Sequence, residues 1–190
     1  MSAATGFVVA GGASRRMGRD KALLPWRGTT LLDLAVARLR ECCRDVVILC
    51  GPEPRYAGRG VPVAVDVAAG TGPLGAVMTG LSHRGAATGL FLAVDLPHVP
   101  ARLLAHLLAL VPGHDLVVPV TARGAEPLCA VYTTACLEAI RERVAAGDLK
   151  MTSFWPAVRR REVGEGELAR FGDPAALFLN VNTPADLPPR

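Results

Sequence analysis

The chain has 190 residues, of which 51% are hydrophobic and 20% are charged, and its net charge is +4. This balance is typical of a globular protein, so the sequence predicts a single domain over residues 1–190 and excludes collagen-like and low-complexity architectures. The longest uncharged stretch, Val67–His83, contains four glycines and a proline, which excludes a membrane helix there. No basic segment with a long apolar run stands at the N-terminus, so we expect a cytoplasmic protein without membrane contact.

Short β-rich runs alternate with helical patterns, and the strands are apolar on both faces. This alternation of strands and helices predicts an α/β fold, a doubly wound, mostly parallel sheet with helices on both faces. The expected strands are Gly6–Ala10, Asp45–Leu49, Val61–Val65, Gly89–Val94, Asp115–Val120, Leu128–Tyr132 and Phe178–Val181. One helix is expected to start near Thr30, and three more are expected over Leu74–Ser82, Ala101–Leu110 and Thr134–Ala146.

The cysteines and the basic residues narrow the class of protein further. The five cysteines form no C-x-x-C pair and no zinc or disulfide pattern, so we expect buried free thiols. Only Lys21 and Lys150 among the 21 basic residues are lysines, which favours a specific use of their compact ammonium groups. The mild charge and the scarcity of aromatic residues argue against nucleic-acid binding.

A glycine-rich segment with several cations follows the first predicted strand. It begins at Ala10-Gly11-Gly12 and continues through Arg15 and Arg16 to Lys21. Such glycines allow backbone N–H groups to approach a phosphate chain, and the cations neutralise it. The segment is neither a Walker A loop nor a G-x-G-x-x-G motif, so P-loop NTPases and nicotinamide enzymes are not indicated.

Two aspartates follow predicted strands directly, and ligands of open parallel sheets bind at such strand ends. Asp95 could hold a phosphate-bound Mg²⁺, which prefers one or two carboxylates together with water. Asp66 stands before the turn Gly72-Pro73-Leu74, whose backbone could read the edge of a base. Each aspartate could also serve only as a cap or turn former.

Taken in order, these elements resemble molybdenum cofactor guanylyltransferases of the MobA type, a family within the nucleotide-diphospho-sugar transferase fold. The resemblance runs from residue 6 to residue 187. It is carried by the opening glycine segment, by Asp66 with Gly72-Pro73-Leu74, by Asp95-Leu96-Pro97, by Glu126-Pro127-Leu128 and by Asn180-Val181-Asn182-Thr183-Pro184-x-Asp186-Leu187. It implies a Rossmann-like nucleotidyltransferase fold and transfer of GMP from GTP to the terminal phosphate of molybdopterin, with release of pyrophosphate.

The resemblance also implies roles for individual residues. Ala10, Gly11, Gly12, Arg16 and Lys21 would hold the triphosphate, with Arg16, Lys21 and Asp95 as the catalytic set. Asp95 would bind Mg²⁺, while Asp66, Gly72, Pro73 and Leu74 would lie beside the guanosine. Asn180 and Asn182 would line the pterin end, although Asn182 could instead cap a helix that begins at Pro184. Lys150 could bind phosphate at the same end or be solvated. A transient molybdoenzyme chaperone is a conceivable partner for a labile product.

Several alternatives stay open at this point. A cytidylyltransferase acting on molybdopterin, or another small-molecule nucleotidyltransferase of the same fold, would carry similar motifs. The resemblance implies GTP over CTP, because the cytidylyl relatives tend to carry Ala-Ala-Gly in place of Ala10-Gly11-Gly12 and a turn different from Gly72-Pro73-Leu74. Sugar-phosphate enzymes of this fold usually have a longer chain for the sugar pocket, so the short chain disfavours that alternative. A non-catalytic nucleotide- or pterin-binding chaperone is the alternative from another class, and the presence of Asp95 argues against it.

Overall fold

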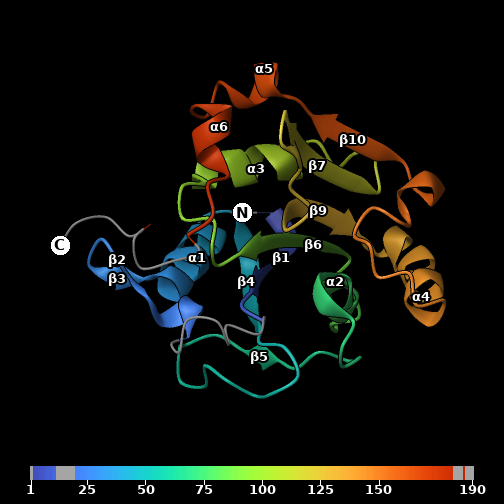
Figure 1. Cartoon of the computed structure of the whole chain (residues 1–190), viewed down its shortest axis with the longest axis horizontal. Coiled ribbons are helices and arrows are strands. Elements are labelled where there is room, and N and C mark those ends of the chain that lie inside the picture. The colour runs from blue at the N-terminus through green and yellow to red at the C-terminus, as the bar shows by residue number, and fades with distance from the viewer. Residues whose placement is uncertain (1, 12–19, 182–185, 187–190) are drawn as a thin grey trace.

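A computed structural model describes residues 2–11, 20–181 and 186 of the chain. In this part of the chain, eight strands form the main sheet, in the order β10-β7-β9-β6-β1-β4-β5 with β8 paired to β7 (Figure 1). The strands are β1 (Ser2–Val9), β4 (Cys43–Leu49), β5 (Val63–Ala64), β6 (Thr88–Ala93), β7 (Leu116–Thr121), β8 (Gly124–Ala125), β9 (Cys129–Thr133) and β10 (Arg160–Val163).

The pairing is parallel across β5, β4, β1 and β6, and again between β10 and β7. Strand β9 runs antiparallel between β6 and β7, so the sheet is mixed but mostly parallel. The α/β prediction is thereby confirmed. The central register pairs Phe7 of β1 with Val47 of β4 and Phe91 of β6, which places the carboxyl ends of these three strands at one edge.

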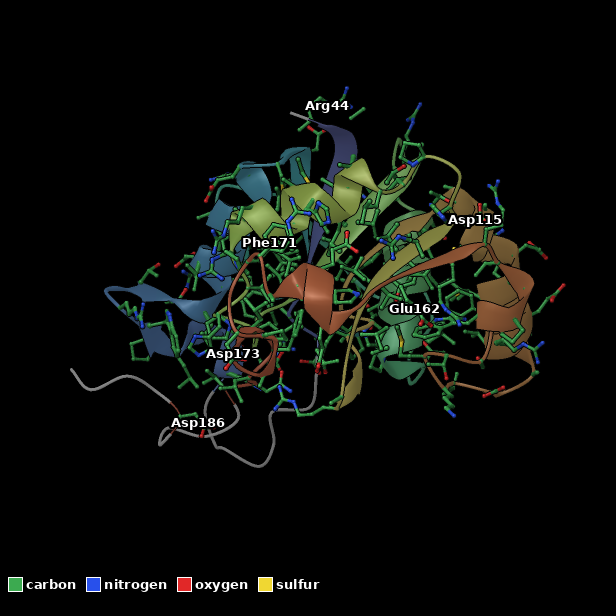
Figure 2. The ribbon with its side chains drawn as sticks, turned by 90° about the horizontal axis from the view of Figure 1, so that it is seen from above. Arg44, Asp115, Glu162, Phe171, Asp173 and Asp186 are labelled. Atoms are coloured by element: carbon green, nitrogen blue, oxygen red, sulfur yellow. The ribbon has the colours of Figure 1, made fainter. Side chains whose placement is uncertain are left out.

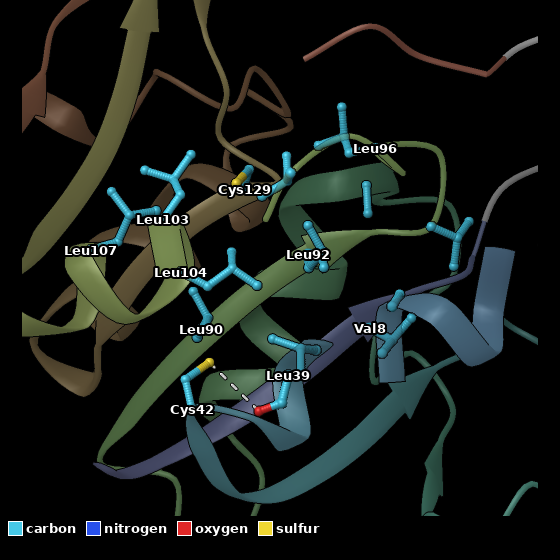
Figure 3. Packing of buried hydrophobic residues seen from close by; sticks show 14 of the residues in the cluster. Val8, Leu39, Cys42, Leu90, Leu92, Leu96, Leu103, Leu104, Leu107 and Cys129 are labelled. Carbon is cyan, nitrogen blue, oxygen red and sulfur yellow. Dashed lines mark hydrogen bonds between the residues drawn. The ribbon is translucent and has the colours of Figure 1, made fainter. Parts of the chain in front are cut away.

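Helices cover both faces of the sheet (Figure 1). The helices are α1 (Leu31–Arg40), α2 (Gly72–Leu81), α3 (Ala101–Ala109), α4 (Leu137–Ala145), α5 (Glu165–Leu168) and α6 (Pro174–Leu177). Alternate strand residues point to opposite faces. Val8, Leu90 and Leu92 therefore pack with α1 and α3 (Figure 3), and the same cluster includes residues of α5 and α6. Phe7 and Phe91 pack with α2 and α4 on the other face.

The predicted strand Phe178–Val181 is wrong. Phe178 ends α6 and is fully buried in the core between that helix and the sheet. Val181 packs with Leu24, Trp26 and Leu31, and its N–H donates to the carbonyl of Asp95 at 3.0 Å. The apolar run is therefore buried by tertiary contacts, without a strand ladder to a neighbouring strand.

Strand β10 was not predicted because its sequence, Arg-Arg-Glu-Val, is charged. It forms the edge of the sheet and pairs with a neighbouring strand on one side only, and charged residues are common on such edge strands. Only Val163 of this strand is buried in the core. Figure 2 shows Glu162 of this strand on the same side of the molecule as Asp115, the residue before β7. The hairpin of β2 (Pro25–Trp26) and β3 (Thr29–Thr30) was also not predicted.

Two other predictions have a clear outcome in the described part of the chain. The five cysteines are buried and free, as expected. The third predicted strand shortens to Val63–Ala64, an edge strand that pairs with Ile48 and Leu49. No helix among the described residues combines the length and the apolar run that a membrane crossing needs.

Candidate functional site

Lys21 and Asp95 meet at the carboxyl edge of the sheet, although 74 residues separate them. The Nζ atom of Lys21 lies 2.8 Å from Oδ2 of Asp95, and their side chains are 17% and 28% exposed. Asp95 follows β6, which is held beside β1 by a hydrogen bond from the N–H of Val94 to the carbonyl of Val9. Lys21 opens a short 3-10 turn that packs against α1. The structure thus places the two residues expected from the sequence in one ion pair.

The backbone at the end of β1 is packed tightly against the end of β4. The N–H of Ala10 donates to the carbonyl of Leu49 at 2.9 Å. A Cβ atom built on Gly11 would lie 2.8 Å from the backbone nitrogen of Gly51 and 2.9 Å from its Cα, so only glycine fits at this position. Gly12 and Arg16, which were predicted to contact the triphosphate, lie outside the described residues.

Asp66 lies on the far side of Gly51 from β1, and its N–H donates to the carbonyl of Gly51 at 2.9 Å. Its Oδ1 atom is buried and has no hydrogen-bond partner in the described part of the chain. Burial raises the pKa of the Asp66 carboxyl above its ordinary value. A buried acceptor without a donor is unusual, and it is chemically suited to a ligand that brings an N–H or O–H group.

The turn after Asp66 leads directly into α2. Gly72 is its first residue and has φ of 59°, Pro73 occupies the first turn, and both are exposed. Leu74 is fully buried in the core, so only its backbone remains for the predicted contact with a nucleoside. The side chain of Thr71 donates to the carbonyl of Ala68 at 2.7 Å and closes the turn.

The polar residues expected at the acceptor end are only partly placed. Asn180 is exposed. The next residue, Val181, donates its N–H to the carbonyl of Asp95, so the backbone of Asn180 lies near that aspartate. Asn182 lies outside the described residues. Lys150 is exposed beyond α4, and no contact in the described structure connects its side chain to Asp95.

Glu126 approaches Asp95 from the antiparallel side of the sheet. Its N–H donates to the carbonyl of Pro119 at 2.9 Å, and two residues later the carbonyl of Leu128 accepts the N–H of Ala93 at 2.8 Å. Burial raises the pKa of the Glu126 carboxyl, Arg123 lowers it, and the nearby negative charge of Asp95 raises it further.

Three residues of the site gave no functional signal in the sequence. Asp20 accepts hydrogen bonds from Tyr56, and Arg55 lies beside both residues. The sequence separation of 36 residues between Asp20 and Tyr56 hides this cluster, because no local pattern connects them. Only the fold brings the segment after β4 beneath the residue that precedes Lys21.

A divalent cation fits the residues that the structure places at this edge. The described residues contain no group of three or more His, Cys, Asp or Glu side chains arranged to bind a metal ion. A nucleotide-bound Mg²⁺ does not need such a group, since phosphate oxygens and water supply most of its ligands. The partly exposed carboxylate of Asp95, a hard oxygen donor, satisfies the remaining requirement.

Comparison with known proteins identifies close relatives. Residues 6–161 match the family model described as a MobA-like NTP transferase domain. A probable molybdenum cofactor guanylyltransferase of Pelotomaculum thermopropionicum is 36% identical over 98% of this chain and 91% of its own. A molybdenum cofactor guanylyltransferase of Desulfosudis oleivorans is 31% identical over 98% of this chain and 94% of its own.

Solved structures share the fold. The molybdopterin-guanine dinucleotide biosynthesis protein A of Archaeoglobus fulgidus superposes with a TM-score of 0.81 at 22% identity, covering 96% of this chain and 94% of that one. A protein of Mycobacterium tuberculosis H37Rv, solved in complex with manganese, has a TM-score of 0.56 at 21% identity, with 84% and 86% covered. At these identities the likeness concerns the fold.

Proposed function

This chain belongs to the family of MobA-like NTP transferases, and from that premise we propose that it is a molybdenum cofactor guanylyltransferase. It transfers GMP from GTP to the terminal phosphate of molybdenum-loaded molybdopterin and releases pyrophosphate. The observation that carries the proposal is the Lys21–Asp95 pair, 2.8 Å apart at the carboxyl edge of the sheet, where the two substrates must meet.

The reaction needs charge neutralisation and alignment more than covalent help from the protein. An oxygen of the acceptor phosphate attacks the α-phosphorus of GTP, and the bond from that phosphorus to the leaving pyrophosphate breaks. Because the attacking phosphate is already an anion near neutral pH, no general base is required.

Different residues at the sheet edge bind the triphosphate and the divalent cation. The ammonium group of Lys21, with the backbone of Ala10 and Gly11, binds the triphosphate, and Gly12 and Arg16 complete that set. Asp95 holds a divalent cation, for which we propose Mg²⁺. When bound, the cation supplies positive charge to the phosphate oxygens.

The two ends of the substrate pair lie on opposite sides of this centre. We assign the guanosine to the side of Asp66, whose unpartnered Oδ1 atom can accept from an N–H or O–H group of the nucleoside. The backbone of Gly72-Pro73-Leu74 borders the same side. We assign the pterin to the side of Asn180 and Asn182.

Residues 1–190 would act as one nucleotidyltransferase domain, and its labile product could pass directly to a molybdoenzyme chaperone.

Calorimetric binding of GTP, CTP and ATP, each with Mg²⁺, tests the nucleotide assignment. The proposal predicts a dissociation constant for GTP at least about tenfold below those for CTP and ATP, since loss of a base-reading hydrogen bond costs roughly 1.5 kcal/mol. Preference for CTP would reassign the protein to cytidylyl transfer onto the same acceptor.

A further inference from the structure

The hydroxyl group of Tyr56 lies between the end of β1 and the residue before Lys21. It is 3.0 Å from Oδ1 and 2.9 Å from Oδ2 of Asp20, and 3.4 Å from the carbonyl oxygen of Ala10. A phenol has one proton to donate, and the shorter distances give it to the Asp20 carboxylate. Tyr56 therefore donates to the residue that follows segment 12–19 and lies beside the carbonyl of Ala10, which precedes it.

Arg55 completes this cluster from the same segment. Its Nη1 atom lies 3.5 Å from Oδ2 of Asp20, and its Nη2 atom donates to the carbonyl of Cys50 at 3.1 Å. The guanidinium group also lies over the ring of Tyr56, 5.3 Å from the centroid. Asp20 is thus tied to the chain at the end of β4 by a charged partner as well as by a hydroxyl.

The Asp20 carboxylate also sets the position of Lys21. Its Oδ1 atom accepts the N–H of Ala22 at 3.0 Å and caps the 3-10 turn Lys21–Leu23. Lys21 is the first residue of this turn, and its ammonium group lies 2.8 Å from Asp95. Displacement of Asp20 would therefore displace the start of the turn and the ammonium group with it.

Tyr56 adopts a backbone conformation that favours glycine, with φ of 68°. A bulky residue keeps this left-handed conformation only where its surroundings hold it. The ring packs against the core on the α1 face, and the hydroxyl is bound to Asp20. The structure thus retains a tyrosine at a position where the backbone alone would favour glycine.

We propose that Tyr56 and Arg55 are positioning residues for nucleotide binding, because they fix Asp20 and thereby place the ammonium group of Lys21 at the triphosphate. The proposal rests on the proposed function, in which Lys21 binds phosphate. Neither residue touches substrate in this account, and both act through Asp20. Their effect should consequently appear with any ligand that carries the phosphate chain, whatever its base.

Tyr56→Phe tests this proposal, because it keeps the ring in the core and removes only the hydroxyl. Calorimetry with Mg²⁺–GTP and with Mg²⁺–pyrophosphate should give dissociation constants raised about tenfold for both ligands, as expected for a lost hydrogen bond to a charged group. Tyr132→Phe is the matched control, since its hydroxyl donates to the carbonyl of Pro127 at 2.7 Å in the buried core. This control should leave both affinities unchanged.

A double-mutant cycle shows whether Tyr56 acts through Lys21. In a Lys21→Ala background the ammonium group is absent, so Tyr56→Phe should change pyrophosphate affinity less than about twofold. A full tenfold loss in that background would overturn the proposal, as would a loss for GTP without a loss for pyrophosphate, because Tyr56 would then contact the nucleoside. Unchanged affinities in folded Tyr56→Phe protein would overturn it as well.

The same measurements separate this proposal from the proposed function. Wild-type protein that binds pyrophosphate but prefers another nucleotide to GTP contradicts the guanylyl assignment alone, and the pyrophosphate arm still decides the role of Tyr56. Wild-type protein that binds neither ligand overturns both.

Discussion

Replacement of Asp95 by Asn removes one negative charge from the centre of the site and leaves its shape almost unchanged. In the structure this carboxylate holds the ammonium group of Lys21 at 2.8 Å. The same ammonium group is expected to bind the triphosphate, so Asp95 competes with the nucleotide when no divalent cation is present. The substitution should therefore have opposite effects on metal-free binding and on metal-dependent turnover.

The size of the effect on metal-free binding follows from the exposure of the ion pair, and the size of the effect on kcat follows from the lost charge of the cation. Hydrogen bonds to charged groups contribute about 1.5–3 kcal/mol, whereas fully exposed ion pairs contribute about 0–1 kcal/mol. With side-chain exposures of 17% and 28%, the Lys21–Asp95 pair falls near the lower end of the first range. Metal-free GTP should then bind about tenfold more tightly to Asp95→Asn. Loss of the cation's charge at the phosphates should reduce kcat by about a thousandfold, equivalent to about 4 kcal/mol.

The assay combines calorimetry with GTP, in the presence of Mg²⁺ and of a chelator, with pyrophosphate release during turnover. Asp45→Asn is the control, since Asp45 is exposed and pairs with Arg44 on the surface. It should change neither quantity. Near-normal Mg²⁺-dependent turnover in Asp95→Asn would remove Asp95 from the cation site, and unchanged metal-free affinity would refute its competition for Lys21.

Three further predictions follow from single contacts. Lys21→Ala should weaken GTP binding about tenfold or more, by about 1.5–3 kcal/mol, as measured by calorimetry; equal affinity would exclude its phosphate contact. Gly11→Ala should lower the free energy of unfolding by about 1–3 kcal/mol in urea titration, because the new Cβ meets the backbone of Gly51 at 2.8 Å; a wild-type midpoint would refute this tight packing. Hydrogen bonds from Arg159 hold the pKa of Asp115 below its ordinary value of 3.8, so its contribution to stability is present above that pH and is lost as pH falls through the native pKa. Asp115→Asn should therefore flatten the fall in unfolding free energy below about pH 4, and an unaltered acid profile would contradict the assignment.

The central strands could be predicted because burial on both faces produces continuous apolar runs. Strands β1, β4 and β6 are of this kind, and each ends beside a residue of the site. The position of Asp95 followed from the end of β6, and the glycine segment was expected at the same edge of the sheet. The ion pair between Asp95 and Lys21 itself is a finding of the structure.

Elements that depend on distant contacts could not be predicted in this way. Val181 is apolar because it fills a small cluster with Leu24 and Trp26, and its sequence context is typical of a strand that the fold does not form. Strand β10 shows the converse case, since its charged residues suit an edge position. The contact of Tyr56 with Asp20 joins two segments that carry no common pattern, so the positioning cluster became visible only in the folded chain.

The most direct test of the central claim is the reaction itself. Purified protein would be incubated with molybdenum-loaded molybdopterin, Mg²⁺ and either GTP or CTP, and both pyrophosphate and the dinucleotide product would be quantified. The account predicts one pyrophosphate for each guanine dinucleotide formed and a kcat/KM for GTP at least about tenfold above that for CTP, a difference of roughly 1.4 kcal/mol in transition-state binding. Faster use of CTP, or GTP bound without any pyrophosphate release, would contradict it.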